Sequence, residues 1–128
     1  MILIDSDVLI AHLRGVPAAG QWLVGARSAD GPLHVSVVSV AEITGGMRAH
    51  EKRQVWRLLA SLRVEDVNEV VARRAGEFMR QFRASHSAIG LGDYLIAATA
   101  DVRGYELATL NVRHFPMFKG LRAPFRIT

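Results

Sequence analysis

The chain has 128 residues, half of them apolar, which fits one domain that can bury a core without cross-links. It has no cysteine, which excludes disulfide bonds, thiolate metal sites and cysteine nucleophiles and suits a reducing cytoplasm. The net charge of +4 and the isoelectric point near 10.3 favour a polyanionic partner such as nucleic acid, although a coding bias toward arginine would give a similar excess.

The amino terminus is apolar only as far as Ile4, because Asp5 follows at once. This run is too short for the apolar region of a signal peptide, and no later run is long enough to cross a bilayer. We therefore expect a soluble, cytoplasmic protein.

Apolar periodicity and turn residues predict a series of short elements along the chain. In chain order they are a strand over 2–4, helices over 8–13 and 17–27, a strand over 33–38, a helix from about 40, a helix over 51–62, a strand over 64–67, helices over 71–82 and 93–102, a strand over 106–110 and an edge strand over 121–127 interrupted by Pro124.

Two helix starts in this series carry acids. Ser39 and Glu42 have the spacing of a capping box, which places the start of that helix near Val40. Asp93 opens a nearly all-apolar helix that stops at Gly104 and belongs in the interior.

The order of elements is β-α-α-β-α-α-β-α-α-β-β. Strands separated by helices imply right-handed crossovers and a mainly parallel sheet of four to five strands with helices on both faces. We therefore expect a single α/β sandwich domain over residues 1–128, without repeats or linkers.

Four oxygen-bearing side chains fall at the carboxyl ends of predicted strands or in the helix turns that follow, where ligands bind in such sheets. They are Asp5, Glu42, Asp93 and Asn111. Magnesium prefers oxygen ligands and takes one or two carboxylates together with water and phosphate oxygens, a role that suits Asp5 and Asp93. Glu42 is the candidate for orienting an attacking water at a phosphodiester.

Each acid also has a purely structural interpretation. Capping alone explains Glu42, and Asp93 can be an N-cap that benefits from the helix dipole. Asp5 ends a buried strand with few polar neighbours, so its position is harder to explain in this way. Asp7 and Asp101 are left outside the predicted metal shell.

Other chemistries have little support in the sequence. There is no glycine-rich phosphate loop, no serine elbow and no close histidine pair of a zinc site. Among the histidines only His114 stands out, because it follows Asn111 by at most one helical turn. We interpret Trp22 and Trp56 as core or interface residues in preference to platforms on which bases stack.

Four segments together resemble the PIN-domain toxins of the VapC type. They are residues 1–10 (MILIDSDVLI), residues 35–43 with Glu42 (VSVVSVAEI), residues 91–100 (LGDYLIAATA) and residues 107–115 (LATLNVRHF). The resemblance spans nearly the whole chain, in order and at the spacing typical of that family. Singly the motifs are modest, and together they are specific.

The resemblance implies a metal-dependent endoribonuclease that uses Mg²⁺ or Mn²⁺, often acts on transfer or ribosomal RNA, forms a homodimer and is silenced by a VapB-type antitoxin. By this similarity Asp5 and Asp93 would bind the metal, and Glu42 would be the third active-site acid. Many relatives have aspartate where this chain has Asn111. That departure puts a second metal ion in doubt.

Two other functions stay open from the sequence. Asp5-Ser6-Asp7 is similar to the start of a haloacid-dehalogenase-type phosphatase, but the only lysines, Lys52 and Lys119, are not in a suitable setting for its phosphate. A non-catalytic RNA-binding or regulatory PIN-like module would explain the neutral Asn111 and the basic helix faces.

Surface contacts are predicted only in outline. Salt-sensitive RNA contacts have Arg48, Arg73, Arg74 and Arg113 as candidates. The apolar residues of the first helices, including Trp22 and Leu23, exceed the apparent needs of the core, and we expect them to form part of the antitoxin or dimer surface.

Overall fold

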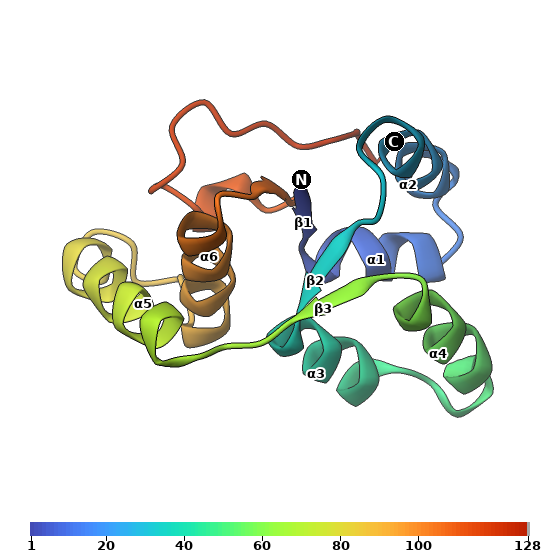
Figure 1. Cartoon of the computed structure of the whole chain (residues 1–128), viewed down its shortest axis with the longest axis horizontal. Coiled ribbons are helices and arrows are strands. Elements are labelled where there is room, and N and C mark those ends of the chain that lie inside the picture. Colours follow the sequence, from blue (N-terminus) through green and yellow to red (C-terminus); the bar gives the residue numbers. More distant parts are fainter. Residues whose placement is uncertain (128) are drawn as a thin grey trace.

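The computed structural model describes residues 1–127. It consists of short strands that alternate with helices, arranged as Figure 1 shows. The elements are β1 (Ile2–Ile4), α1 (Ser6–Leu13), α2 (Pro17–Asp30), β2 (His34–Ser36), α3 (Val37–Gly46), η1 (Ala49–Glu51), α4 (Lys52–Ala60), β3 (Arg63–Glu65), α5 (Glu69–Phe82), α6 (Leu91–Arg103), β4 (Glu106–Ala108) and η2 (Val112–His114).

The sheet has four strands in the order β3-β2-β1-β4, and every pairing is parallel. Leu3 of β1 lies opposite His34 of β2 on one side and Leu107 of β4 on the other. All carboxyl ends therefore lie at one edge of the sheet, as the predicted α/β sandwich requires.

Side chains alternate between the two faces of the central strand β1. Ile2 and Ile4 belong to the apolar cluster shared with α1, α2, α3 and α4, whereas Leu3 belongs to the cluster shared with α5 and α6. Two cores, one on each face, result from this period of two. The helix predicted to be interior is so, since Ile96–Ala100 of α6 are all buried.

The start of α3 differs from the prediction. The helix begins at Val37, its N-cap is Ser36, and the Ser36 hydroxyl accepts a hydrogen bond from the Val38 N–H at 3.1 Å. Ser39 is fully buried inside the helix, so the predicted capping box with Glu42 does not form. Either serine could cap a helix. Because β2 ends at Ser36, Ser36 takes the N-cap position.

Two further predictions are corrected. Asp93 is the third residue of α6, so it is not the N-cap; Gly90 is the N-cap, and the Asp93 side chain accepts a hydrogen bond from its N–H at 3.4 Å. Residues 121–127 run across the molecule without forming a strand, so the sheet has four strands and not five (Figure 1). Pro124 lies in this segment and cannot donate a backbone hydrogen bond to a sheet. Among residues 1–127, none of the helices has the length and hydropathy needed to span a bilayer.

Candidate active site

Asp5 lies at the centre of the sheet edge where the strands end. Its backbone N–H donates to Ala108 O of β4 at 2.8 Å, and its side chain caps α1 by accepting from the Ser6 N–H at 2.8 Å. The second carboxylate oxygen accepts from the Thr109 hydroxyl at 2.8 Å. With 5% of its surface exposed, Asp5 is a buried acid held in place through both oxygens.

Asp7 is tied to the loop that follows β4. Its Oδ2 accepts hydrogen bonds from the Leu110 N–H at 3.0 Å and from the Thr109 hydroxyl at 3.2 Å. Its Oδ1 is buried and has no hydrogen-bond partner among residues 1–127. Asp7 therefore anchors the Asp5 loop to the segment after β4.

Glu42 reaches the same edge from α3. Its Oε1 accepts a hydrogen bond from the Ser6 hydroxyl at 3.2 Å, and Ser6 thereby links it to Asp5. Its Oε2 lies 3.8 Å from the position that a Cβ atom at Gly92 would take. The carboxylate of Glu42 thus lies over the first turn of α6, in which Asp93 is the next residue.

Asp93 is oriented by two donors. Its Oδ2 lies 2.9 Å from His114 Nδ1 and 3.4 Å from the Gly90 backbone N–H. An ionised carboxylate only accepts, so Nδ1 of His114 carries the proton in this pair. Within residues 1–127 no protein group donates to Oδ1, which leaves that oxygen available to a ligand.

Asn111 joins the group only through its backbone. Its N–H donates to the Thr109 hydroxyl at 3.0 Å, while the residue is exposed and its side chain makes no capping hydrogen bond in the described chain. The structure therefore brings together Asp5, Glu42 and Asp93, whereas the side chain of Asn111 is not connected to them.

The carboxyl groups of Asp5, Asp7 and Asp93 concentrate negative charge at this edge of the sheet. The pKa of Asp5 is raised to about 7, first by burial and then by the nearby charges of Asp7 and, to a lesser extent, Asp93, which together outweigh the hydrogen bonds from Thr109 and Ser6 that lower it. Burial also raises the pKa of Asp7. Such a cluster favours either a bound proton or a bound cation.

The donor set fits a hard divalent cation that keeps part of its water. Among residues 1–127 no three histidine or acidic side chains lie close enough to enclose a metal ion by themselves. Mg²⁺ does not require such a cage, because one or two carboxylates suffice when water and phosphate oxygens complete its shell. The buried acid Asp5 and the free Oδ1 of Asp93 would be these carboxylates.

Two polar residues of the site were not singled out from the sequence. Ser6 bridges Asp5 and Glu42, and Thr109 holds both Asp5 and Asp7. The available signal was position, since Ser6 directly follows Asp5 and Thr109 directly follows the end of β4. The side chain of His114, which the sequence did mark, contacts Asp93, while its backbone N–H donates to Asn111 O at 3.1 Å.

A family model described as the PIN domain matches residues 2–118. The chain is 68% identical over 127 residues to Ribonuclease VapC10 of Mycobacterium tuberculosis (strain ATCC 25618 / H37Rv), an alignment that covers 99% of this chain and 95% of that protein. It is 38% identical over 125 residues to Ribonuclease VapC19 of the same strain, covering 98% and 100% of the two chains.

Solved structures give the same fold. A toxin-antitoxin complex from Klebsiella pneumoniae contains a chain that superposes with a TM-score of 0.81 at 24% identity, covering 99% of this chain and 100% of that one. FitAcB from Neisseria gonorrhoeae superposes with a TM-score of 0.72 at 26% identity, covering 90% and 91%. The likeness extends over nearly the whole molecule in both cases.

Proposed function

This chain belongs to the PIN-domain family and is a ribonuclease of the VapC type, and from that premise we propose that it is a Mg²⁺- or Mn²⁺-dependent endoribonuclease. The observation that supports metal dependence is the buried acid Asp5, whose pKa is raised to about 7 beside other carboxylates. The family assignment also removes the phosphatase alternative. The proposed substrates are transfer or ribosomal RNA of the cytoplasm.

Asp5 and Asp93 would hold the cation. Bound there, it would supply positive charge that aligns the scissile phosphate and offsets the charge that develops on it. Ser6 and Thr109 fix the two oxygens of Asp5, so little reorganisation of this carboxylate is needed when substrate binds.

Glu42 is placed to act on water. It is exposed, it is fixed by one hydrogen bond from Ser6, and its second oxygen faces the first turn of α6. A carboxylate in this position can accept a hydrogen bond from a water molecule and take its proton as it attacks phosphorus. Asn111 would have to rotate its side chain inward to join this group.

The neighbouring structures support a proposed antitoxin partner. The Klebsiella pneumoniae chain is part of a toxin-antitoxin complex, and VapBC complexes from Rickettsia felis and Salmonella typhimurium share the fold. We accordingly assign this chain the toxin role, with a VapB-type antitoxin as inhibitor and a homodimer as the assembly. Leu23 is buried in the core and Trp22 is half-buried against it, so the partner surface at these two residues stays a prediction.

Cleavage of RNA tests the proposal. Purified, partner-free protein is incubated with transfer RNA and ribosomal RNA in Mg²⁺ or Mn²⁺, in EDTA, and in EDTA followed by excess metal. We expect discrete fragments with metal, none in EDTA, and recovery after metal is restored. RNA binding without cleavage in every condition would instead indicate the regulatory module that the sequence left open.

His114 is expected to position Asp93 for the cation. His114→Ala removes the 2.9 Å contact and frees the Asp93 carboxylate to rotate, so the Mn²⁺ affinity should fall by about 10- to 100-fold. His114→Asn is the matched control, because its amide nitrogen can occupy the place of Nδ1 and should restore most of the affinity. Calorimetric titration measures the Mn²⁺ affinity of both variants. If His114→Ala and His114→Asn bound Mn²⁺ with equal affinity, the assignment would be contradicted.

A further inference from the structure

The outer face of α4 combines exposed cations with an exposed tryptophan. Trp56 has 47% of its surface exposed, whereas the inner face of the helix packs Val55 and Leu59 into the core. Lys52 and Arg53 precede Trp56 by one turn, and Arg57 follows it; all three are exposed. Residues at these spacings lie on adjacent rows of one helix face.

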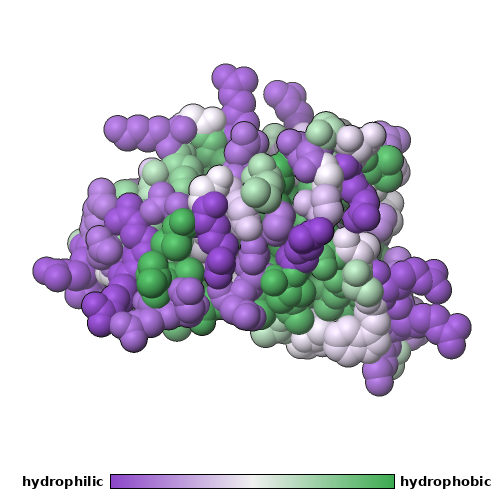
Figure 2. Space-filling view, viewed as in Figure 1, coloured by the Kyte–Doolittle hydropathy of each residue, from purple (hydrophilic) through white to green (hydrophobic). Residues whose placement is uncertain are grey.

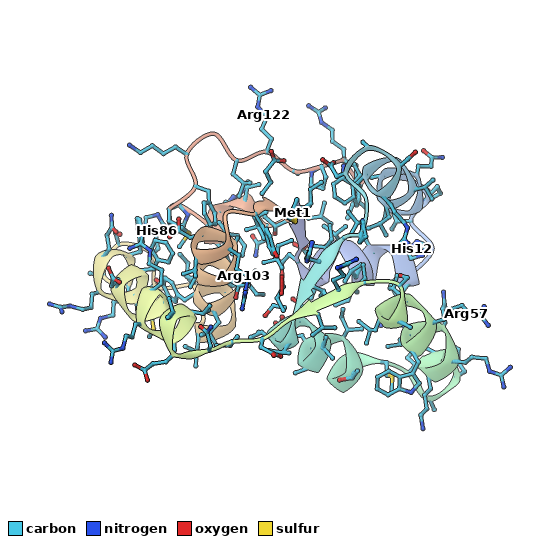
Figure 3. All side chains as sticks on the ribbon, in the orientation of Figure 1. Met1, His12, Arg57, His86, Arg103 and Arg122 are labelled. Carbon is cyan, nitrogen blue, oxygen red and sulfur yellow. The ribbon has the colours of Figure 1, made fainter. Side chains whose placement is uncertain are left out.

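Part of this face lines a surface hollow of about 430 Å³. Its walls are Ala49, His50, Lys52, Arg53 and Trp56. No acidic side chain lines it. Figure 2 shows hydrophilic side chains projecting from the edge of the molecule that α4 forms, and Figure 3 shows Arg57 extending away from that helix.

The cations of this face are uncompensated, unlike Arg73 and Arg74 of α5. Within residues 1–127 no acidic group lies in a salt bridge with Lys52, Arg53 or Arg57, and the neighbouring Glu51 is buried and paired with Arg14. By contrast, α5 carries the pairs Arg73–Glu69 at 2.7 Å and Arg74–Asp101 at 2.7 Å.

The contrast bears on the arginines named as RNA contacts from the sequence. Arg73 and Arg74 are already engaged with acids, so a polyanion would gain less from them. The α4 face has no such competition. Its chemistry is that of single-strand nucleic-acid binding, in which an aromatic ring stacks on a base and adjacent cations contact the backbone phosphates.

We propose that the α4 face, formed by His50, Lys52, Arg53, Trp56 and Arg57, is a binding subsite for single-stranded RNA in which Trp56 stacks on a base. This inference deepens the proposed function and rests on it. The helix preceding it, α3, carries Glu42 and packs beside α4 (Figure 1). An RNA strand that leaves the acidic cluster along α3 reaches this face next.

Binding of a 12-nucleotide oligouridylate to the full chain in EDTA tests the subsite. We expect quenching of tryptophan fluorescence that is lost in Trp56→Phe, which removes the fluorophore while Trp22 remains. Trp56→Ala should weaken binding by about 5- to 150-fold, the usual contribution of one stacked base. Trp56→Phe should retain most of the affinity because it keeps an aromatic ring.

The charges are tested with a pair of matched double variants. Affinity falls with salt, and Lys52→Gln with Arg53→Gln should reduce the magnitude of the slope of log affinity against log salt by about 1.4 if both cations contact phosphates. Arg73→Gln with Arg74→Gln changes the net charge equally but removes cations that already pair with acids, so it should leave the slope nearly unchanged. Circular dichroism of each variant checks that the fold is retained.

The outcomes separate this inference from the nuclease proposal. RNA affinity within twofold of wild type in Trp56→Ala overturns the subsite even if metal-dependent cleavage is present, and so does a loss of antitoxin binding alone, which would assign the face to a protein partner. Trp56-dependent binding without metal-dependent cleavage by the wild type would keep the subsite and overturn the nuclease.

Discussion

Asp5→Asn is expected to lower the rate of RNA cleavage by more than about 100-fold, since loss of a group that only supports a metal ligand already costs up to that much. The substitution keeps the shape of the side chain but removes its charge at the point where the strands β1 and β4 end. Cleavage of a fluorescently labelled RNA by wild type and variant at saturating Mn²⁺ measures the effect.

Asp66→Asn is the matched control for this experiment. Asp66 is exposed between β3 and α5, and only its backbone carbonyl is used, as acceptor for Arg103 at 3.2 Å. Its replacement should leave the rate within twofold of wild type. Cleavage by Asp5→Asn at a wild-type rate would remove Asp5 from the mechanism.

Asp5→Asn is also expected to stabilise the metal-free protein at pH 8. Asp5 has a pKa raised to about 7 in the folded chain, so the native state binds a proton that the unfolded state has already released above pH 4. The free energy of unfolding therefore falls as pH rises from about 4 to about 7 and then levels off. The full cost is of the order of 2–4 kcal/mol.

Asparagine avoids this cost without losing its neighbours. Its oxygen can accept from the Ser6 N–H, and its amide can donate to the Thr109 hydroxyl. Urea unfolding in EDTA should show that Asp5→Asn is more stable than wild type at pH 8 and that the difference disappears near pH 4. A variant that is less stable than wild type at pH 8 would show that Asp5 is not strained by its burial.

The strand ends were the most informative feature of the sequence. A parallel α/β order places the strand ends and the starts of the helices at one edge, and this rule groups Asp5, Glu42 and Asp93 but also Asn111, whose side chain is not connected to them. The start of α3 was placed three residues late because Ser36 and Ser39 are equally good caps in isolation. Only tertiary packing distinguishes them, since Ser39 is fully buried.

The charge state of Asp5 could not be predicted in the same way. It depends on the degree of burial beneath neighbouring elements and on Thr109, which is 104 residues away in the chain. The same limit applies to Asn111, because its position after β4 is visible in the sequence while the direction of its side chain depends on η2. Helical spacing led to the same prediction for Trp56 and Trp22, a core or interface position. In the structure Trp22 is half-buried and Trp56 is exposed.

The measurement that tests the central claim most directly follows RNA cleavage and Mn²⁺ occupancy in the same samples. EDTA-treated, dialysed protein is titrated with Mn²⁺, free Mn²⁺ is determined by electron paramagnetic resonance, and the cleavage rate is recorded at each point for wild type and Asp5→Asn. We expect the wild-type rate to rise in proportion to bound Mn²⁺ and both quantities to be lost in Asp5→Asn. Cleavage that persists without bound metal, or Mn²⁺ binding that is unchanged in Asp5→Asn, would contradict the account.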